Sequence, residues 1–179
     1  QVQYNPTTGK FVDPNTGQIF NNAAELDLAN TFHTTPGGPV TIPKTPEFDA
    51  FKASADFKGD DALAARAYEL FQQGKWTELE TFVHQNGLNS NWPPNQGFTS
   101  ITPQTIPQGM KIDRYGHPGG KFVSPEGVPY TQRALPVGTD GKPYNVYEVL
   151  KPINVEAGPA IPWFGEAGMG VQFKLPMSV

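Results

Sequence analysis

The stretch YNVYEVLKPINVEAGPAIPWFGEAGMGVQFKLP, residues 144–176, is the part of the sequence that decides the fold class. Residues 146–150 alternate in the manner of a half-buried strand. Residues 171–175 alternate as well, which places Gln172 and Lys174 on one face and three apolar side chains on the other. The intervening glycines and prolines favour turns. This stretch therefore predicts strands joined by turns, as in an antiparallel sheet.

Two helices are predicted before the strand-rich region. Asp60 or Asp61 is placed to cap a helix that runs to Gln73 and ends at the following glycine. The sequence TELE at residues 77–80 has the spacing of a capping box, so a second helix is expected to begin there. An Asn-Gly pair at residues 86–87 predicts the end of that helix.

Residues 1–46 are predicted to form a lead-in segment. KFV at residues 10–12 and QIF at residues 18–20 flank the turn sequence DPNTG, which indicates a β-hairpin. A short helix is expected over residues 22–32, where apolar side chains recur at helical spacing. Residues 34–46 are rich in proline and glycine and are interpreted as a linker.

The predicted fold class is α+β and mostly β, with a twisted antiparallel sheet core and two or three N-terminal helices. The main domain is expected over residues 47–179. Within it, residues 47–88 form the helical part and residues 89–179 the β-rich part.

Composition disfavours several function classes. The chain has 13 basic and 17 acidic residues, a net charge of −4 and no run of like charge, so nucleic-acid binding is disfavoured. No apolar stretch approaches the roughly 20 residues that a membrane-spanning helix needs. The chain begins with glutamine and not methionine, which suggests a fragment of a longer polypeptide. Cysteine is absent, which fits the cytosol and equally fits a protein that crosses a barrier and refolds in a reducing compartment.

Metal and nucleophile chemistry find little support in the sequence. His33, His84 and His117 lie far apart, so no metal is predicted, and only a calcium site built from scattered loop oxygens stays open. The chain has neither cysteine nor a Gly-x-Ser-x-Gly motif. The glycine-rich GEAGMG at residues 165–170 precedes a strand and not a helix, which is more typical of a turn than of a phosphate loop.

Four clusters of residues together indicate a ligand site. WPPNQGF (residues 92–98) carries an aromatic side chain beside a stiff diproline. DRYG (residues 113–116) and TQRALP (residues 131–136) each place an arginine in a turn, and AGPAIPWFG (residues 157–165) is a rigid apolar loop. Each cluster alone is explained as well by a surface ion pair or a structural turn. Together they fit a site for an anionic ligand that carries aromatic rings, because arginine binds phosphate and rings stack.

In this order, the clusters resemble the NAD glycohydrolase domain of the tuberculosis necrotizing toxin family. The matching phrases are WPPNQGF, DRYGHPGGKFVSPEGVPYTQRALP (residues 113–136) and the stretch over residues 144–176, which together cover about the last half of the chain. The family hydrolyses the bond between nicotinamide and ribose in NAD, and usually in NADP, without a metal or cofactor. The resemblance implies that residues 89–179 are the catalytic part and that NAD(P)+ is the substrate.

The resemblance also implies roles for individual residues. Arg114 and Arg133 would grip phosphates, and Gln172 would be the catalytic polar residue near the scissile ribose. Asn145 stands where the toxin that names the family carries a histidine, and an amide cannot shuttle a proton as an imidazole does. The implied catalytic residues are Gln172, Arg114 and Asn145. The implied substrate-binding residues are Tyr115, Phe122, Arg133, Trp163, Phe164 and Gly170.

The function that the resemblance implies is that of an NAD(P)+ glycohydrolase toxin. Such a toxin would form the C-terminal part of a larger secreted effector, would be secreted or delivered into a target cell to act in its cytosol, and would have a cognate immunity protein as partner. The alternatives are a secreted or surface fungal-type NADase, which the absence of cysteine disfavours, a non-catalytic NAD-binding module, and a purely structural domain. Glu148 and Glu156 are available carboxylates, but nicotinamide leaves as a neutral molecule and needs no general acid.

Overall fold

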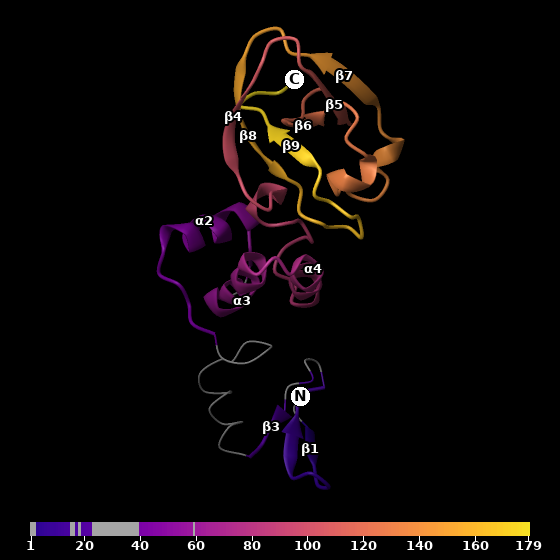
Figure 1. The fold of residues 1–179 in the computed structure, drawn as a ribbon. Helices are drawn as coiled ribbons and strands as arrows, with labels where there is room; N and C mark the ends of the chain where they lie inside the picture. The colour runs from indigo at the N-terminus through magenta and orange to yellow at the C-terminus, as the bar shows by residue number, and fades with distance from the viewer. Residues whose placement is uncertain (1–2, 15–16, 18, 23–39, 59) are drawn as a thin grey trace.

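The main body of the protein is a six-stranded sheet in a computed structural model that describes residues 3–14, 17, 19–22, 40–58 and 60–179. The strands run in the order β4-β8-β9-β6-β5-β7, and every neighbouring pair is antiparallel (Figure 1). They are β4 (Thr102–Ile106), β5 (Lys111–Tyr115), β6 (Phe122–Pro125), β7 (Tyr144–Glu148), β8 (Ile153–Pro159) and β9 (Val171–Lys174). The last strand in sequence, β9, therefore lies in the interior of the sheet.

The alternation predicted for two of these strands is confirmed for β9 and corrected for β7. In β9, Phe173 is buried whereas its neighbours Gln172 and Lys174 are half-buried, as the alternation predicts, but Val171 at the start of the strand is exposed. The strand β7 begins and ends two residues earlier than the expected 146–150. As a result, Val146 is on the exposed side of the strand, and its neighbours in the strand are the less exposed residues.

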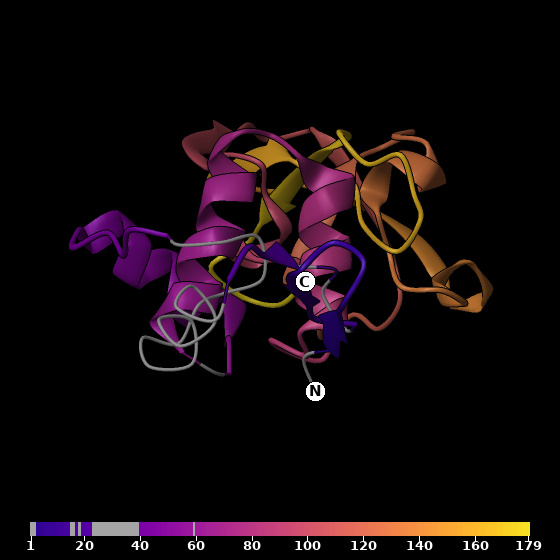
Figure 2. The same cartoon turned by 90° about the horizontal axis from the view of Figure 1, so that it is seen from below.

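Helices α2 (Pro46–Ala55), α3 (Asp61–Gln72) and α4 (Trp76–Gln85) lie together beyond one end of the sheet (Figures 1 and 2). The predicted helix at Asp60 is confirmed, because its carboxylate accepts a hydrogen bond from the amide of Leu63 at 2.9 Å. The prediction that a capping box at residues 77–80 begins the next helix is wrong. The N-cap of α4 is Lys75, which makes no side-chain capping bond, so Thr77 lies within the helix. The predicted end at residues 86–87 is confirmed.

The first helix, α2, was not predicted as a separate element, although its start carries a sequence signal. Thr45 is the N-cap, and its hydroxyl accepts a hydrogen bond from the amide of Phe48 at 3.2 Å. Pro46 occupies the first helical position, where its missing N–H costs nothing. The proline that suggested a linker therefore begins a helix.

Two clusters of buried side chains form the core of the main body. One lies within the sheet and includes Ile112, Val155 and Phe173. The other joins the helices to the segment that follows β8, and includes Leu79 of α4 and Trp163. The helices are thus packed on the loop that leads into β9, and they support it from the side away from the sheet.

The lead-in segment contains a small antiparallel sheet of β1 (Gln3–Asn5), β2 (Lys10–Val12) and β3 (Ile19–Phe20). The predicted hairpin of β2 and β3 is confirmed by the pairing of Phe11 with Phe20. β1 adds a strand that was not predicted. Residues 23–32 of the expected helix and residues 34–39 of the linker fall outside the described residues. Among the residues that are described, no helix is long and apolar enough to span a membrane.

Candidate active site

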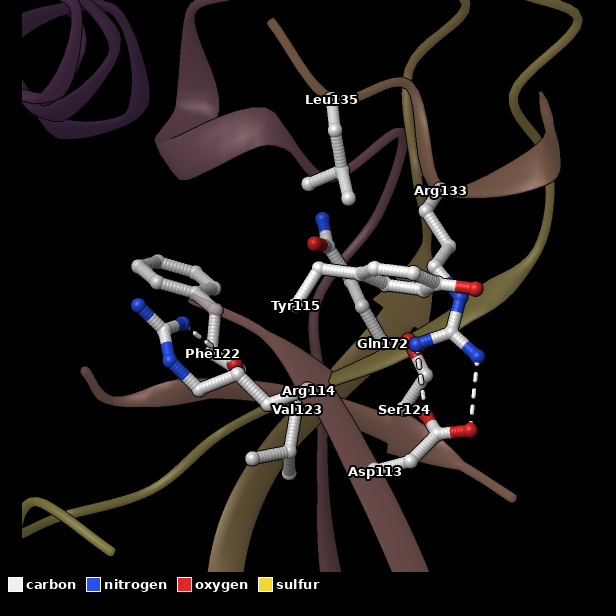
Figure 3. Close-up of a pocket in the computed structure, with 9 residues that line it drawn as sticks. All are labelled: Asp113, Arg114, Tyr115, Phe122, Val123, Ser124, Arg133, Leu135 and Gln172. Carbon is white, nitrogen blue, oxygen red and sulfur yellow. Dashed lines mark hydrogen bonds and ion pairs between the residues drawn. The ribbon is translucent and has the colours of Figure 1, made fainter. Parts of the chain in front are cut away.

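A cleft of about 550 Å³ opens between the sheet, the segment at residues 92–97 and the segment at residues 133–142. Gln172 of β9, Arg114 and Tyr115 of β5, and Phe122 of β6 contribute side chains from the sheet. The predicted site residues that line this cleft are Arg114, Tyr115, Phe122, Arg133, Phe164 and Gln172. A small pocket of about 40 Å³, drawn in Figure 3, shares most of these residues. The structure therefore brings together residues that are up to about 60 positions apart in sequence.

The charged side chains that line the cleft are all basic. They are Arg114, Arg133, Lys142 and Lys174, and none of the described residues along its walls is an aspartate or a glutamate. The chain as a whole carries a net charge of −4, so the positive charge is a local property of the cleft. A concave surface lined by one sign of charge attracts ligands of the opposite sign, here an anion.

Gln172 lies on the polar face of β9 and projects into the cleft. Its Nε2 donates a hydrogen bond to the carbonyl of Gly97 at 2.8 Å. Within the described part of the chain, no hydrogen bond engages its Oε1. In Figure 3 the carboxamide points toward Leu135, and in this view it lies between the rings of Tyr115 and Phe122. The amide oxygen is therefore available to a ligand.

The carbonyl that holds Gln172 belongs to a turn with an unusual backbone, the short 3₁₀ helix η1 (Asn95–Gly97). Asn95, Gln96 and Gly97 have φ values of 53°, 57° and 83°, all in the left-handed region. A non-glycine residue in this region costs about 1–3 kcal/mol and persists only where its surroundings hold it. The Gly97 carbonyl also accepts from the amide of Ile161 at 2.9 Å, and Gln96 Oε1 accepts from the ammonium group of Lys174.

The turn residues 95–97 and Lys174 were missing from the predicted site, although the sequence carried one signal for each. WPPNQGF was recognised as a cluster without any of its residues being assigned a role. Lys174 shares the polar face of β9 with Gln172, as the alternation indicated. A single sequence could not indicate which strand the turn would contact.

Arg114 combines a place in the cleft with a structural role. Its Nε donates to the carbonyl of His117 at 2.7 Å, and its Nη1 donates to the carbonyl of Phe122 at 2.9 Å. A side chain at Gly120 would overlap the guanidinium group, because its Cβ would lie 1.9 Å from the Arg114 Cζ. Arg114 thus holds the loop between β5 and β6 in place, and its Nη2 has no bond to a described residue.

Arg133 has partners other than a phosphate. It is 7% exposed, and its Nη1 and Nη2 lie 2.5 Å and 2.8 Å from the carboxylate oxygens of Asp113, which is fully buried. Its Nε and Nη2 both donate to the carbonyl of Val128, at 3.0 Å and 2.8 Å. These contacts use four of its five N–H donors, so a bidentate grip on a phosphate would have to break the buried ion pair. The expected phosphate contact of Arg133 stays a prediction, limited to a single N–H.

The Asp113–Arg133 pair supports an aromatic wall of the cleft. The guanidinium carbon of Arg133 lies 5.1 Å from the centre of the Tyr115 ring. The Tyr115 ring also contacts the rings of Tyr130 and Tyr144, with centroid distances of 5.1 Å and 4.9 Å. The hydroxyl of Tyr144 donates to Asp113 at 2.7 Å, and this bond to the carboxylate raises the pKa of Tyr144 to about 12. Tyr115 is therefore held in place from several sides.

A second pair of rings forms the wall near the helices. The Trp92 and Phe164 rings meet edge to face, with centroids 5.6 Å apart, and both line the cleft. The amide of Phe164 donates to the carboxylate of Glu80 in α4 at 2.7 Å, which ties this wall to the helices. The cleft thus has aromatic surfaces on separate elements, with the polar face of β9 also lining it.

Three predicted site residues do not line the cleft. Trp163 is fully buried in the core, where its indole N–H donates to the carbonyl of Asn91 at 2.8 Å. Gly170 is a packing position, since a Cβ there would lie 2.7 Å from a methyl group of Val128. Asn145 is half-buried on β7, opposite Arg114 in the β5–β7 pairing, and is outside the cleft.

Neither of the available carboxylates lines the cleft. Glu148 is at the exposed end of β7, and Glu156 is on β8, paired with Lys174 across the strands. In the part of the chain that the structure describes, no three residues of the types His, Cys, Asp or Glu are grouped to hold a metal ion.

Comparison with known proteins shows what the part of the chain that carries this site resembles. Residues 105–179 match the family model described as tuberculosis necrotizing toxin. The chain is 38% identical over 151 residues to the conidial surface nicotinamide adenine dinucleotide glycohydrolase nadA of Aspergillus fumigatus, a match that covers 76% of this chain and 60% of that protein. The chain thus spans about three fifths of the length of this relative.

Two solved structures are also similar to parts of the chain. Tuberculosis necrotizing toxin, solved with its immunity factor IFT, matches with a TM-score of 0.40 and 28% identity over 48% of this chain and 51% of that one. Tse6, solved with Tsi6, matches with a TM-score of 0.32 and 17% identity over 74% of this chain and 92% of that one.

The family match spans β5 to β9, and with them Arg114, Tyr115, Phe122 and Gln172. The resemblance noted from the sequence is therefore confirmed, since residues 105–179 match the model of the tuberculosis necrotizing toxin family.

Proposed function

We propose that this chain is an NAD(P)+ glycohydrolase. Water attacks the ribose carbon as its bond to nicotinamide breaks, and NAD then yields nicotinamide, ADP-ribose and a proton. The observation that carries the proposal is the Oε1 of Gln172, which no described residue engages, in a cleft whose charged side chains are all basic. The family match and the name of the Aspergillus relative support the same activity.

The proposed chemistry depends on electrostatics and orientation. In NAD the nicotinamide ring carries a positive charge, and positive charge develops on the ribose as the glycosidic bond breaks. The Oε1 of Gln172 would accept a hydrogen bond from the ribose or face the developing charge, and either contact favours the transition state. Because nicotinamide leaves as a neutral molecule, the scheme needs no paired carboxylates, unlike ordinary glycosidases. It also draws on no metal or cofactor.

The phosphates would bind at the basic residues that have donors to spare. Lys142 lines the cleft, and its ammonium group has no partner among the described residues. Arg114 retains its Nη2. We therefore assign phosphate binding to Arg114 and Lys142 in place of Arg133. The rings of Tyr115, Phe122 and Phe164 would hold the two aromatic ends of the dinucleotide.

The direct test is nicotinamide release from NAD and NADP by the purified chain. Gln172→Ala should lower kcat about a hundredfold or more, of order 3 kcal/mol, with little change in melting temperature. Gln104→Ala is the matched control, because Gln104 is exposed on β4 and does not line the cleft. An unchanged kcat in Gln172→Ala would show that other residues carry out the catalysis. Binding of NAD by the wild type without release of nicotinamide would favour a non-catalytic binding module.

The cellular role is also a proposal. The Aspergillus relative is named as a conidial surface enzyme, which supports action outside the cytosol of the producing cell. The chain is 38% identical to this fungal surface enzyme although it contains no cysteine. The absence of cysteine is therefore not evidence against the fungal-type alternative. Delivery into a target cell and a cognate immunity protein over the cleft are further parts of the proposal. Their test is whether a candidate immunity protein abolishes nicotinamide release at a one-to-one ratio.

A further inference from the structure

The turn Asn95–Gly97 is hydrogen-bonded to β9 at two points. These two contacts bear on the orientation of Gln172. Gly97 accepts from the Nε2 of Gln172 at 2.8 Å, and the neighbouring Gln96 accepts from the ammonium group of Lys174. Gln172 and Lys174 alternate along β9 and share its polar face. Consecutive residues of the turn therefore bind alternate residues of the strand, although the partners are 75 and 78 positions apart in sequence.

The turn depends on these contacts for its shape. Its three residues all have left-handed backbones, which non-glycine residues keep only when neighbouring groups hold them. The side-chain amide of Asn95 donates to the carbonyl of Phe98 at 2.8 Å, which stabilises the turn from within. Besides the bond from Gln172 to Gly97, the contact between Gln96 and Lys174 fixes the turn to β9, and the amide of Ile161 holds the Gly97 carbonyl from a second direction. Removing the Gln96 side chain would leave the Gly97 carbonyl less firmly placed against the strand.

The orientation of the Gln172 carboxamide follows from the position of that carbonyl. A carboxamide has an acceptor on one side and a donor on the other. With Nε2 held by Gly97, Oε1 must point away from the turn and is left to the cleft. If the group were free to rotate, it would present N–H groups to a ribose that is becoming positively charged, and the sign of the interaction would reverse.

We propose that Gln96 is a positioning residue, which acts through Lys174 to hold the turn against β9 and thereby keeps the Gln172 oxygen directed at the substrate. The proposal rests on the NAD glycohydrolase activity proposed above. It assigns Gln96 no contact with the reacting atoms.

The first test is kinetic. Gln96→Ala should lower kcat about tenfold and change KM by less than about threefold, because it disturbs the orientation of Gln172 and leaves the phosphate-binding residues in place. Gln96→Glu keeps an acceptor oxygen for Lys174, so its kcat should stay within about twofold of the wild type. Gln104→Ala again serves as the control. A kcat within about twofold of the wild type in Gln96→Ala, or an equal loss in the Ala and Glu variants, would overturn the proposal.

A double-mutant cycle separates positioning from general loosening of the loop. In a Gln172→Ala background, Gln96→Ala should have no further effect on kcat, because the group that it positions is gone. If the same fold loss persisted in that background, Gln96 would act independently of Gln172 and the proposal would be wrong.

A spectroscopic readout does not require activity. The side-chain amide signal of Gln172, assigned by its disappearance in Gln172→Ala, should be shifted and protected in the wild type and in Gln96→Glu. It should move toward the position of a free amide in Gln96→Ala. An unmoved signal would refute the positioning role even if the wild type released no nicotinamide, and that second result would count only against the proposed function.

Discussion

Replacing Arg133 by methionine tests whether this arginine supports the fold or grips the substrate. Methionine keeps much of the apolar stem but removes both bonds to Asp113 and both donors to the Val128 carbonyl. Asp113 is fully buried, and among the described residues its carboxylate would keep the Gly127 amide, at 3.2 Å, and the Tyr144 hydroxyl, at 2.7 Å, as its only partners. Breaking a buried pair by removing one partner costs about 3–5 kcal/mol, since the remaining charge stays buried without compensation.

The expected loss is large enough to measure by thermal unfolding followed by circular dichroism. In a domain of this size about 1 kcal/mol lowers Tm by about 2–4 °C, so a decrease of roughly 6–20 °C is expected. Urea titration with an unchanged m-value should give the same loss of unfolding free energy. The control is Asp61→Asn, which removes an ion pair to Lys52 at 3.1 Å in which the Asp61 side chain is 59% exposed, and should cost less than about 1 kcal/mol.

The two roles of Arg133 predict opposite results. A structural residue loses stability, and below the melting temperature of the variant its KM for NAD changes by less than about threefold. A phosphate-binding residue would raise KM strongly at nearly constant Tm. A stability loss below about 1 kcal/mol in Arg133→Met would refute the structural reasoning.

Three further predictions concern the cleft and its surroundings. Arg114→Ala should lower kcat/KM for NAD about a hundredfold and lower Tm by a few degrees, because Arg114 also holds two loop carbonyls; activity within about twofold would rule out its role in the cleft. The pKa of Tyr144 is raised to about 12 by its bond to Asp113, so the stabilisation from this bond is complete below about pH 10 and is lost as pH rises through 12. Tyr144→Phe should therefore lose less stability than the wild type between about pH 10 and 12, and equal slopes of Tm against pH would contradict this. Nicotinamide release should survive EDTA; loss of activity that zinc or magnesium restores would contradict the metal-free mechanism, whereas a rise of Tm with calcium alone would indicate a structural ion.

The sequence predicted features that depend on local patterns. The alternation around Gln172 placed it correctly on the polar face of a strand, and Asp60 was recognised as a helix cap because both signals lie within a few residues. Phe122 and Phe164 were likewise assigned to the site, and both line the cleft. For these residues, local chemistry and the family resemblance agree with the geometry.

Features that depend on distant partners could not be predicted in this way. Nothing near Arg133 in the sequence indicates that Asp113, 20 positions earlier, is its ion-pair partner. The sequence therefore predicted a phosphate-binding arginine and not a buried ion pair. Trp163 and Phe164 are adjacent aromatic residues in one loop, yet only one faces the cleft, because the helices bury the other. The Gly97–Gln172 contact depends on how the turn folds back on the sheet.

The interior position of β9 determines when the cleft can form during the emergence of the chain. Its sequence follows that of every other strand, yet it pairs with β8 on one side and with β6 on the other. A chain that emerges N-terminus first, from a ribosome or through a membrane, therefore cannot complete the sheet until residues 171–174 are free. Until then, two strand edges remain unpaired and open to association with other chains. The same segment supplies Gln172 and Lys174, so a chain that is still emerging has no finished cleft until residues 171–174 are free.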